Sequence, residues 1–70
     1  MDMVSVSSSQ ISAIGYDSET MEARVEFSNG SVYSYSQVPM GVTDSIIHSE
    51  SPGRTFAQVL KFGYQYSRIS

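Results

Sequence analysis

The stretch from residue 21 to residue 35 restricts the fold of this chain more than any other. Between residues 21 and 27, apolar and charged side chains alternate at every position, which is typical of a β-strand with one buried face. Asn29 and Gly30 follow, and this pair is a strong hairpin signal because both residue types tolerate a positive φ. Residues 32–35 supply the return strand. We therefore expect residues 21–35 to form an antiparallel hairpin.

The residues before the hairpin and directly after it predict further strands and a helix. Residues 11–16 are rich enough in β-branched and aromatic side chains for a strand, whereas residues 1–7 form either a flexible lead-in or an edge strand. Val42, Ile46 and Ile47 recur at helical spacing, which predicts a helix up to about residue 49.

A second helix is expected to begin at Ser51 and Pro52. The Ser51 hydroxyl would cap the helix, and proline suits the first position because its missing N–H is not needed there. An apolar stripe continues to Leu60, and Gly63 is placed to end the helix in the left-handed conformation. Residues 64–69 then alternate in a way that predicts a short final strand.

The expected fold is one α+β domain over residues 1–70, a small antiparallel β-meander of three to four strands followed by two short helices. A chain of this length buries only roughly 60% of its unfolded surface, so it depends on tight packing or on self-association. The residues expected in its core are Ile14, Val25, Phe27, Ile46, Phe56 and Leu60.

The length of the hairpin loop decides which way Tyr33 and Tyr35 point. With a two-residue loop, Glu26 lies opposite Tyr33, and the two rings form an open platform beside Arg24. With a three-residue loop and a glycine bulge, Val25 lies opposite Tyr33, and both rings join the core face with their hydroxyls at its rim. We favour the second register because large rings then face small side chains, but the sequence allows both.

The composition excludes several classes of site. The chain has no cysteine and one histidine, which rules out disulfides, thiolate metal sites and histidine-rich metal sites. No P-loop or dinucleotide-binding glycine pattern is present, and we expect neither a cofactor nor a metal. No apolar run approaches the roughly 20 residues that span a bilayer, and the N-terminal residues lack the features of a signal peptide. We expect a cytoplasmic protein without membrane contact.

The charges are unevenly distributed along the chain. The net charge is −3, which disfavours a general polyanion binder. Residues 1–50 contain all seven acidic side chains and only one of the four basic ones, whereas residues 51–70 contain three cations and no acid. A phosphate contact is therefore expected in the last twenty residues.

Three short motifs occur in order with suitable gaps. They are Gly-Tyr-Asp at residues 15–17, Tyr-x-Tyr-x-x-Val-Pro at residues 33–39 and Ser-x-Gly-x-x-Phe at residues 51–56. In these motifs, and over residues 4–69, the chain resembles the KTSC domain. This module of similar size occurs at the C-terminus of some lysyl-tRNA synthetases and as a stand-alone protein in bacteria and their viruses.

The resemblance implies a binding role rather than a defined activity. The family has no settled activity, and RNA binding has been proposed for it because of its attachment to a synthetase. Members are often basic in the final third, whereas this chain has Pro52, Ala57, Gly63 and Ser67 where polar or cationic side chains are usual. This departure weakens the case for polyanion binding in this member.

Two groups of residues near the C-terminus are candidates for ligand contacts. Arg54 and Lys61 are seven residues apart, so on one continuous helix they would project in almost the same direction and could grip a phosphate. Tyr64, Tyr66 and Arg68 combine aromatic and basic character, as single-strand binding surfaces do. A closing strand whose rings complete the core is the favoured alternative.

Catalysis is not expected. His48 is adjacent to Ser49 and Glu50 in sequence, but this adjacency does not supply the geometry of a nucleophile, a base and an orienting carboxylate. Glu22 and Glu26 would lie about 13 Å apart on one strand, too far for most acid–base pairs.

We consider two functional hypotheses. In the first, the chain is a non-catalytic module that recognises RNA or a small nucleotide or phosphorylated ligand. The binding surface would lie either on one chain or across a homo-oligomer interface that brings the few cations together. Its ligand-binding residues would be Tyr33, Tyr35, Arg54, Lys61, Tyr64 and Arg68. In the second, the chain is a protein-interaction or assembly module, such as a bacterial or phage accessory protein, with no nucleic-acid role.

Overall fold

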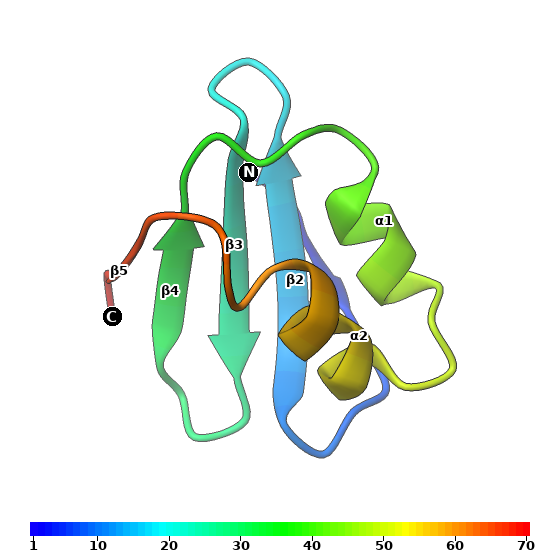
Figure 1. The fold of residues 1–70 in the computed structure, drawn as a ribbon. Helices are drawn as coiled ribbons and strands as arrows, with labels where there is room; N and C mark the ends of the chain where they lie inside the picture. The colour runs from blue at the N-terminus through cyan, green and yellow to red at the C-terminus, as the bar shows by residue number, and fades with distance from the viewer.

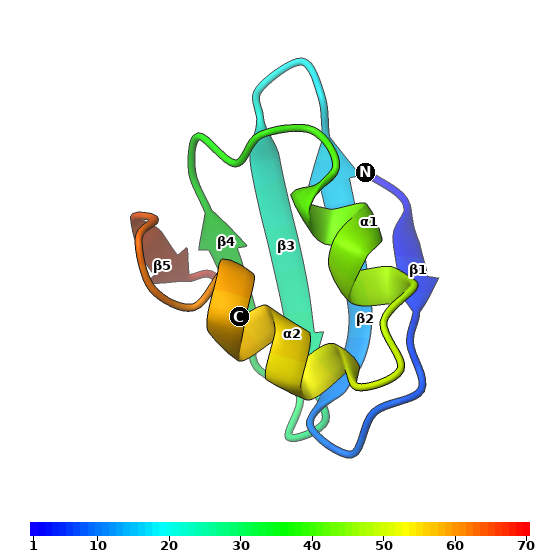
Figure 2. The same ribbon diagram turned by 45° about the vertical axis from the view of Figure 1, so that its right-hand side comes forward.

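Five strands form one antiparallel sheet, and two helices lie together against one of its faces (Figures 1 and 2). The structure, a computed structural model, describes all 70 residues. The elements in chain order are β1 (Met3–Ser5), β2 (Ile11–Asp17), β3 (Glu22–Phe27), β4 (Val32–Tyr35), α1 (Val42–Ile47), α2 (Pro52–Val59) and β5 (Tyr66–Arg68).

Each strand pairs with its neighbours in sequence order, so the sheet is a meander from β1 to β5. The helices are inserted between β4 and β5, and β5 returns to pair with β4 at the edge of the sheet (Figure 1). The expected α+β fold is confirmed. The two short edge strands, β1 and β5, extend the expected meander to five strands.

Phe27 and Ser31 close the hairpin between β3 and β4, so its loop has three residues, 28–30. The Phe27 N–H donates to the Ser31 carbonyl at 2.8 Å, the Gly30 N–H donates back to the Phe27 carbonyl at 2.9 Å, and Gly30 has φ 93°. This closure places Val25 opposite Tyr33 and Ala23 opposite Tyr35. Of the two registers that the sequence allows, the structure therefore has the one that turns both tyrosines toward the core face.

A bulge in β2 lets two isoleucines enter the core from one strand. Ile11 lies opposite Phe27, whereas Ala13 already lies opposite Glu26, so the pairing shifts between Ile11 and Ala13. Ile14 then falls opposite Val25. Residues three apart would point to opposite faces of a regular strand, and the extra residue of the bulge brings both isoleucines to the helix-facing side.

The core lies between this face and the helices. Five of the six residues expected there are fully buried, and Phe27 is half-buried and packs against them. The buried cluster contains Ile11, Ile14, Ala23, Val25, Tyr35, Val38, Ile46, Phe56 and Leu60. At its rim the Tyr16 hydroxyl donates a hydrogen bond of 2.6 Å to the Val38 carbonyl, which ties β2 to the segment that leads into α1.

Two expectations about α2 are wrong in detail. Pro52 occupies the first turn as expected, but the Ser51 hydroxyl makes no capping bond, and the Ser51 N–H instead donates to Ser49 Oγ at 3.0 Å. The helix also ends at Val59, before Gly63. Its end is set by the Phe56 carbonyl, which accepts the N–H groups of both Leu60 and Lys61 and so closes the last turn early. Gly63 keeps the expected left-handed φ of 97°, in the turn that follows.

Candidate ligand-binding groove

A groove of about 560 Å³ lies between the C-terminal end of α2 and the part of the sheet formed by β3, β4 and β5. Its size falls within the usual range of small-molecule sites, roughly 300 to 1,000 Å³. Six of its eleven lining residues are aromatic, namely Phe27, Tyr33, Tyr35, Phe56, Phe62 and Tyr66. The remainder are Gln10, Ser28, Asn29, Ser31 and Lys61.

The aromatic rings hold one another in place. Phe56 of α2 meets Phe27 edge-on at a centroid distance of 5.5 Å and Tyr35 at 5.9 Å. Phe27 also meets Tyr33 at 5.6 Å with the ring planes 87° apart. Tyr66 of β5 is tilted against Tyr33 at 5.9 Å and against Tyr35 at 5.7 Å. Because edge-to-face packing of this kind is favourable, the groove is formed without a ligand.

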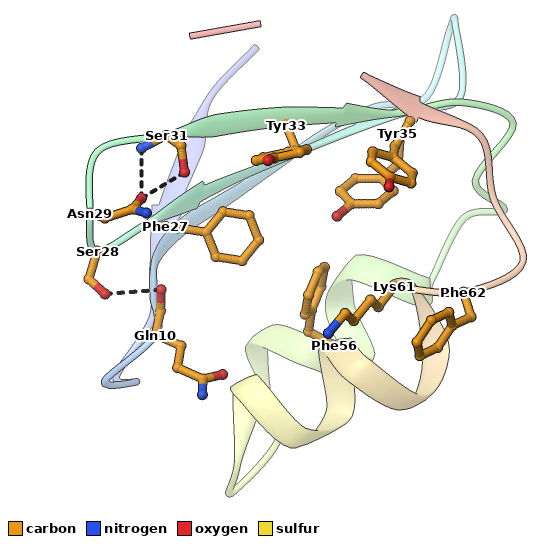
Figure 3. Close-up of a pocket in the computed structure, with 11 residues that line it drawn as sticks. Gln10, Phe27, Ser28, Asn29, Ser31, Tyr33, Tyr35, Phe56, Lys61 and Phe62 are labelled. Carbon is orange, nitrogen blue, oxygen red and sulfur yellow. Dashed lines mark hydrogen bonds between the residues drawn. The ribbon is translucent and has the colours of Figure 1, made fainter. Parts of the chain in front are cut away.

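The rings divide into a buried floor and an exposed rim. Tyr35 and Phe56 are 4% and 6% exposed, whereas Tyr66 and Phe62 are 60% and 74% exposed. Figure 3 shows Tyr35 projecting from the sheet toward Phe56, with Phe62 beside Lys61 at the end of α2. A planar molecule could therefore reach the floor through a mouth that is lined by rings.

The Tyr35 hydroxyl is the polar group on this floor. Tyr16 is the only tyrosine whose hydroxyl forms a hydrogen bond within the chain. Every fully buried polar atom of a side chain has a partner, so the unpartnered Tyr35 hydroxyl is not fully buried. The Tyr35 hydroxyl therefore opens into the groove. Burial raises the pKa of Tyr35 to about 12, with smaller contributions from Tyr66 and Tyr33, so the group is a neutral phenol at physiological pH.

One end of the groove is polar and has a fixed arrangement (Figure 3). Asn29 Oδ1 accepts two hydrogen bonds from Ser31, one from the backbone N–H at 3.0 Å and one from the hydroxyl at 2.6 Å. The Ser28 hydroxyl donates to the Ser9 carbonyl at 2.8 Å and lies 3.1 Å from the Gln10 carbonyl. Because the Asn29 oxygen is already used twice, this side chain offers a ligand only its N–H donors.

Lys61 is the only charged residue that lines the groove. Its Nζ lies 5.6 Å from the centroid of the Phe62 ring, at the opposite end from Asn29 (Figure 3). The groove therefore combines an apolar interior with one positive charge at its edge.

The structure brings together three of the six residues that the sequence suggests as ligand contacts. Tyr33, Tyr35 and Lys61 all line the groove. Arg68 of β5 lies just outside the groove, opposite Tyr33 of β4. Its Nε donates to the Ser70 carbonyl at 3.0 Å. Cross-strand partners share a face, so Arg68 stands on the groove side of the sheet edge.

Arg54 and Tyr64 lie elsewhere. Arg54 borders a polar hollow of about 380 Å³ beside the serines of residues 7–9, and Tyr64 borders another of about 250 Å³ beside Ser36 and Gln37. Since α2 ends at Val59, Lys61 is not on the helix, and the expected line of Arg54 and Lys61 along one helical face does not form.

The sequence does not indicate several of the groove residues. It predicts Phe27 and Phe56 only as core residues and Asn29 only as a turn residue. Phe62 follows Lys61 directly, and an exposed aromatic beside a cation was the one local signal for this end of the groove. Gln10 carries no such signal, because it reaches the groove only through the pairing of β2 with β3.

The one ion pair of the chain lies outside the groove. Glu22 accepts hydrogen bonds from Arg24 Nε and from the Ser34 hydroxyl, each at 2.7 Å, and these two bonds lower the pKa of its carboxyl. His48 is exposed at the end of α1. No group of three or more potential metal ligands is present. Neither helix has the length and apolar surface that crossing a bilayer requires.

The chain is similar in sequence and in fold to several known proteins. The family model of the KTSC domain matches residues 7–64. An uncharacterized protein of Stutzerimonas stutzeri is 41% identical over 70 residues, which covers 99% of both chains. The crystal structure of a KTSC domain protein from Yersinia pestis has a TM-score of 0.90 at 31% identity, with 99% of this chain and 97% of that chain covered. A lysine–tRNA ligase of Trichormus variabilis is 34% identical over 55 residues, which covers 79% of this chain and 10% of the ligase.

Proposed function

This chain belongs to the KTSC domain family, and we propose that it is a non-catalytic binding module whose aromatic groove holds the base of a nucleotide. The observation that carries the proposal is the groove itself, six aromatic rings around about 560 Å³ with a single cation at one end. Aromatic side chains bind bases by stacking, a contact worth about 1–3 kcal/mol per base.

The position of Lys61 supports a nucleotide over an uncharged aromatic compound. A base among the rings leaves its sugar and phosphate at the mouth of the groove, where Lys61 supplies the positive charge. Arg68 lies nearby on β5 and offers a second cation to a longer ligand. The family relationship to a region of lysine–tRNA ligases, whose name refers to tRNA, is consistent with a nucleotide ligand.

The overall charge favours a short ligand over a long nucleic acid. Affinity for polyanions rests largely on many Lys and Arg side chains that replace counterions. This chain has a net charge of −3, and of its four cations Arg24 is paired with Glu22 and Arg54 borders a different hollow. We therefore propose that recognition involves one nucleotide, either free or as an unpaired residue of RNA.

A charge reversal with a matched control tests this proposal. NMR chemical-shift titration with 5′-UMP and with a single-stranded U6 RNA would measure affinity for the wild-type chain, Lys61→Glu and Arg54→Glu. Both substitutions change the net charge equally, but only Lys61 lines the groove. We expect Lys61→Glu to weaken binding about tenfold or more, equivalent to about 1.4 kcal/mol, and Arg54→Glu to have a much smaller effect.

The outcome also identifies the source of the nucleotide. Similar affinity for 5′-UMP and U6 would indicate a free nucleotide, whereas much tighter binding of U6 would indicate RNA. Equal losses in the two variants would mean that only the net charge matters. Absence of binding to both probes would contradict the proposal.

The exposed rim favours a second candidate function, assembly with a protein. Phe62 and Tyr66 are both more than half exposed, and aromatic residues of this kind are enriched in protein interfaces. The partner could be a second copy of the chain. Light scattering over a range of concentrations tests this candidate, since an apolar interface gives concentration-dependent association that changes little with salt and that Phe62→Ser would abolish. A monomer at all concentrations would exclude self-association.

A further inference from the structure

We propose that the groove distinguishes bases by their exocyclic groups and prefers a base with a carbonyl oxygen to one with an amino group, with the Tyr35 hydroxyl as the donor that reads this difference. This inference rests on the proposed nucleotide-binding function and adds a specificity to it.

The position of Tyr35 is the first argument. Its side chain is 4% exposed, lies on the floor against Phe56, and has no hydrogen-bond partner within the chain, although its hydroxyl reaches the groove. Tyr16 provides a contrast, since its hydroxyl is fully used by the Val38 carbonyl. Because this hydroxyl is open to the groove and is not used by the chain, it can exchange a water molecule for a ligand that reaches the floor.

The balance of donors and acceptors is the second argument. No carboxylate lines the groove, and the ammonium of Lys61 only donates. The Asn29 oxygen is occupied by Ser31, which leaves only its N–H groups. The amide oxygen of Gln10 is the only other side-chain carbonyl of the lining, and it lies at the opposite end of the groove from Tyr35 (Figure 3).

The Tyr35 hydroxyl itself favours an acceptor on the ligand. A phenol is a good donor but a weak acceptor, because its oxygen lone pair is delocalised into the ring. This phenol is protonated at physiological pH, as an ordinary tyrosine is, so it has a proton to donate. An exocyclic amino group brought to the floor would lose its water without gaining a strong acceptor, whereas a carbonyl oxygen would accept directly from the hydroxyl.

Two nucleotides of almost identical shape test this preference. Uracil in 5′-UMP has a carbonyl oxygen at C4 beside an N–H at N3, whereas cytosine in 5′-CMP has an amino group at C4 beside an unprotonated N3. The C2 carbonyl, the sugar and the phosphate are the same, and the Tyr35→Phe variant shows which part of any difference depends on the hydroxyl. We expect isothermal titration calorimetry to show that the wild-type chain binds 5′-UMP about five- to tenfold more tightly than 5′-CMP, the size of one neutral hydrogen bond.

The variant Tyr35→Phe removes only the hydroxyl. We expect it to bind both nucleotides with about the affinity that the wild-type chain has for 5′-CMP. Because the hydroxyl bonds to nothing in the chain, the variant should fold normally, and its unfolding temperature checks this. Tyr16→Phe is the matched control, since it should lower stability and leave the preference for 5′-UMP intact.

Each result bears on a different claim. Equal binding of the two nucleotides, or a preference that survives in Tyr35→Phe, overturns the specificity and leaves the proposed function standing. Binding of neither nucleotide overturns the specificity, and absence of U6 RNA binding as well overturns the proposed function. The comparison of 5′-UMP with 5′-CMP on the wild-type chain needs no variant, so the inference can be refuted even if Tyr35→Phe does not fold.

Discussion

Two tyrosines of this chain have similar rings and opposite uses of their hydroxyls. Tyr16 lies at the rim of the core, and its hydroxyl donates a hydrogen bond to the Val38 carbonyl. Tyr35 is more deeply buried, and its hydroxyl forms no hydrogen bond within the chain. The first arrangement contributes to stability, because removing the donor would leave a buried carbonyl unsatisfied at a cost of about 1–3 kcal/mol. The second leaves a polar group free on the floor of the groove.

The burial of Tyr35 predicts a loss of stability in alkali. Its pKa is about 12 in the folded chain, compared with 10.0 for an ordinary tyrosine. Between these values the unfolded chain releases a proton that the folded chain retains, so the free energy of unfolding falls as pH rises through this window. Urea denaturation at pH 8, 10 and 11 should show a smaller decrease in Tyr35→Phe than in the wild-type chain. Parallel decreases in the two chains would show that another group is responsible.

At the scale of the elements, the hairpin between β3 and β4 determines which side of the sheet becomes the groove. A loop shorter by one residue would pair Glu26 with Tyr33 and turn both tyrosines away from the helices. The observed loop instead pairs Val25 with Tyr33, and this register depends on Gly30 with φ 93°. One backbone conformation outside the groove therefore places two of its rings.

Substitutions at Gly30 test this dependence. An added Cβ at this position meets no atom within 4 Å, so Gly30→Ala introduces backbone strain and no steric clash. We expect a loss of about 1–2 kcal/mol in the free energy of unfolding, because this conformation is unfavourable for residues with a side chain. Gly30→Asn should lose less, since asparagine tolerates a positive φ. Urea denaturation of both variants provides the measurement, and equal losses would contradict the argument.

The local patterns in the sequence predicted the elements better than the groove. The alternation in residues 21–27, the Asn29-Gly30 pair and Pro52 each depend on near neighbours, and they predicted β3, the hairpin and the start of α2. Gly63 predicts a later end for α2 than the structure has, because the Phe56 carbonyl accepts the N–H groups of Leu60 and Lys61 and closes the helix before Gly63. The groove itself combines rings from β3, β4, α2 and β5, and no local pattern encodes their packing across the sheet.

At the scale of the whole molecule, the groove and the core share their walls. Phe56 and Tyr35 belong to the buried cluster and also line the groove. The same small set of side chains therefore supplies both stability and the candidate binding surface. A domain of this size has a free energy of unfolding of roughly 4 to 10 kcal/mol, so little of it can be lost before the groove disappears with the fold.

Leu60 provides the test of how small this margin is. It follows α2, is fully buried in the core cluster and does not line the groove. Leu60→Ala should cost about 2–5 kcal/mol, because it leaves a cavity in the buried cluster to which Tyr35 and Phe56 also belong. The neighbouring Val59 is 36% exposed, so Val59→Ala should cost far less. We expect circular dichroism with urea to show Leu60→Ala partly or wholly unfolded in buffer and Val59→Ala close to the wild-type chain. A loss below about 1 kcal/mol for Leu60→Ala would mean that the core can repack around the gap, and that the rings of the groove are less firmly held than their contacts indicate.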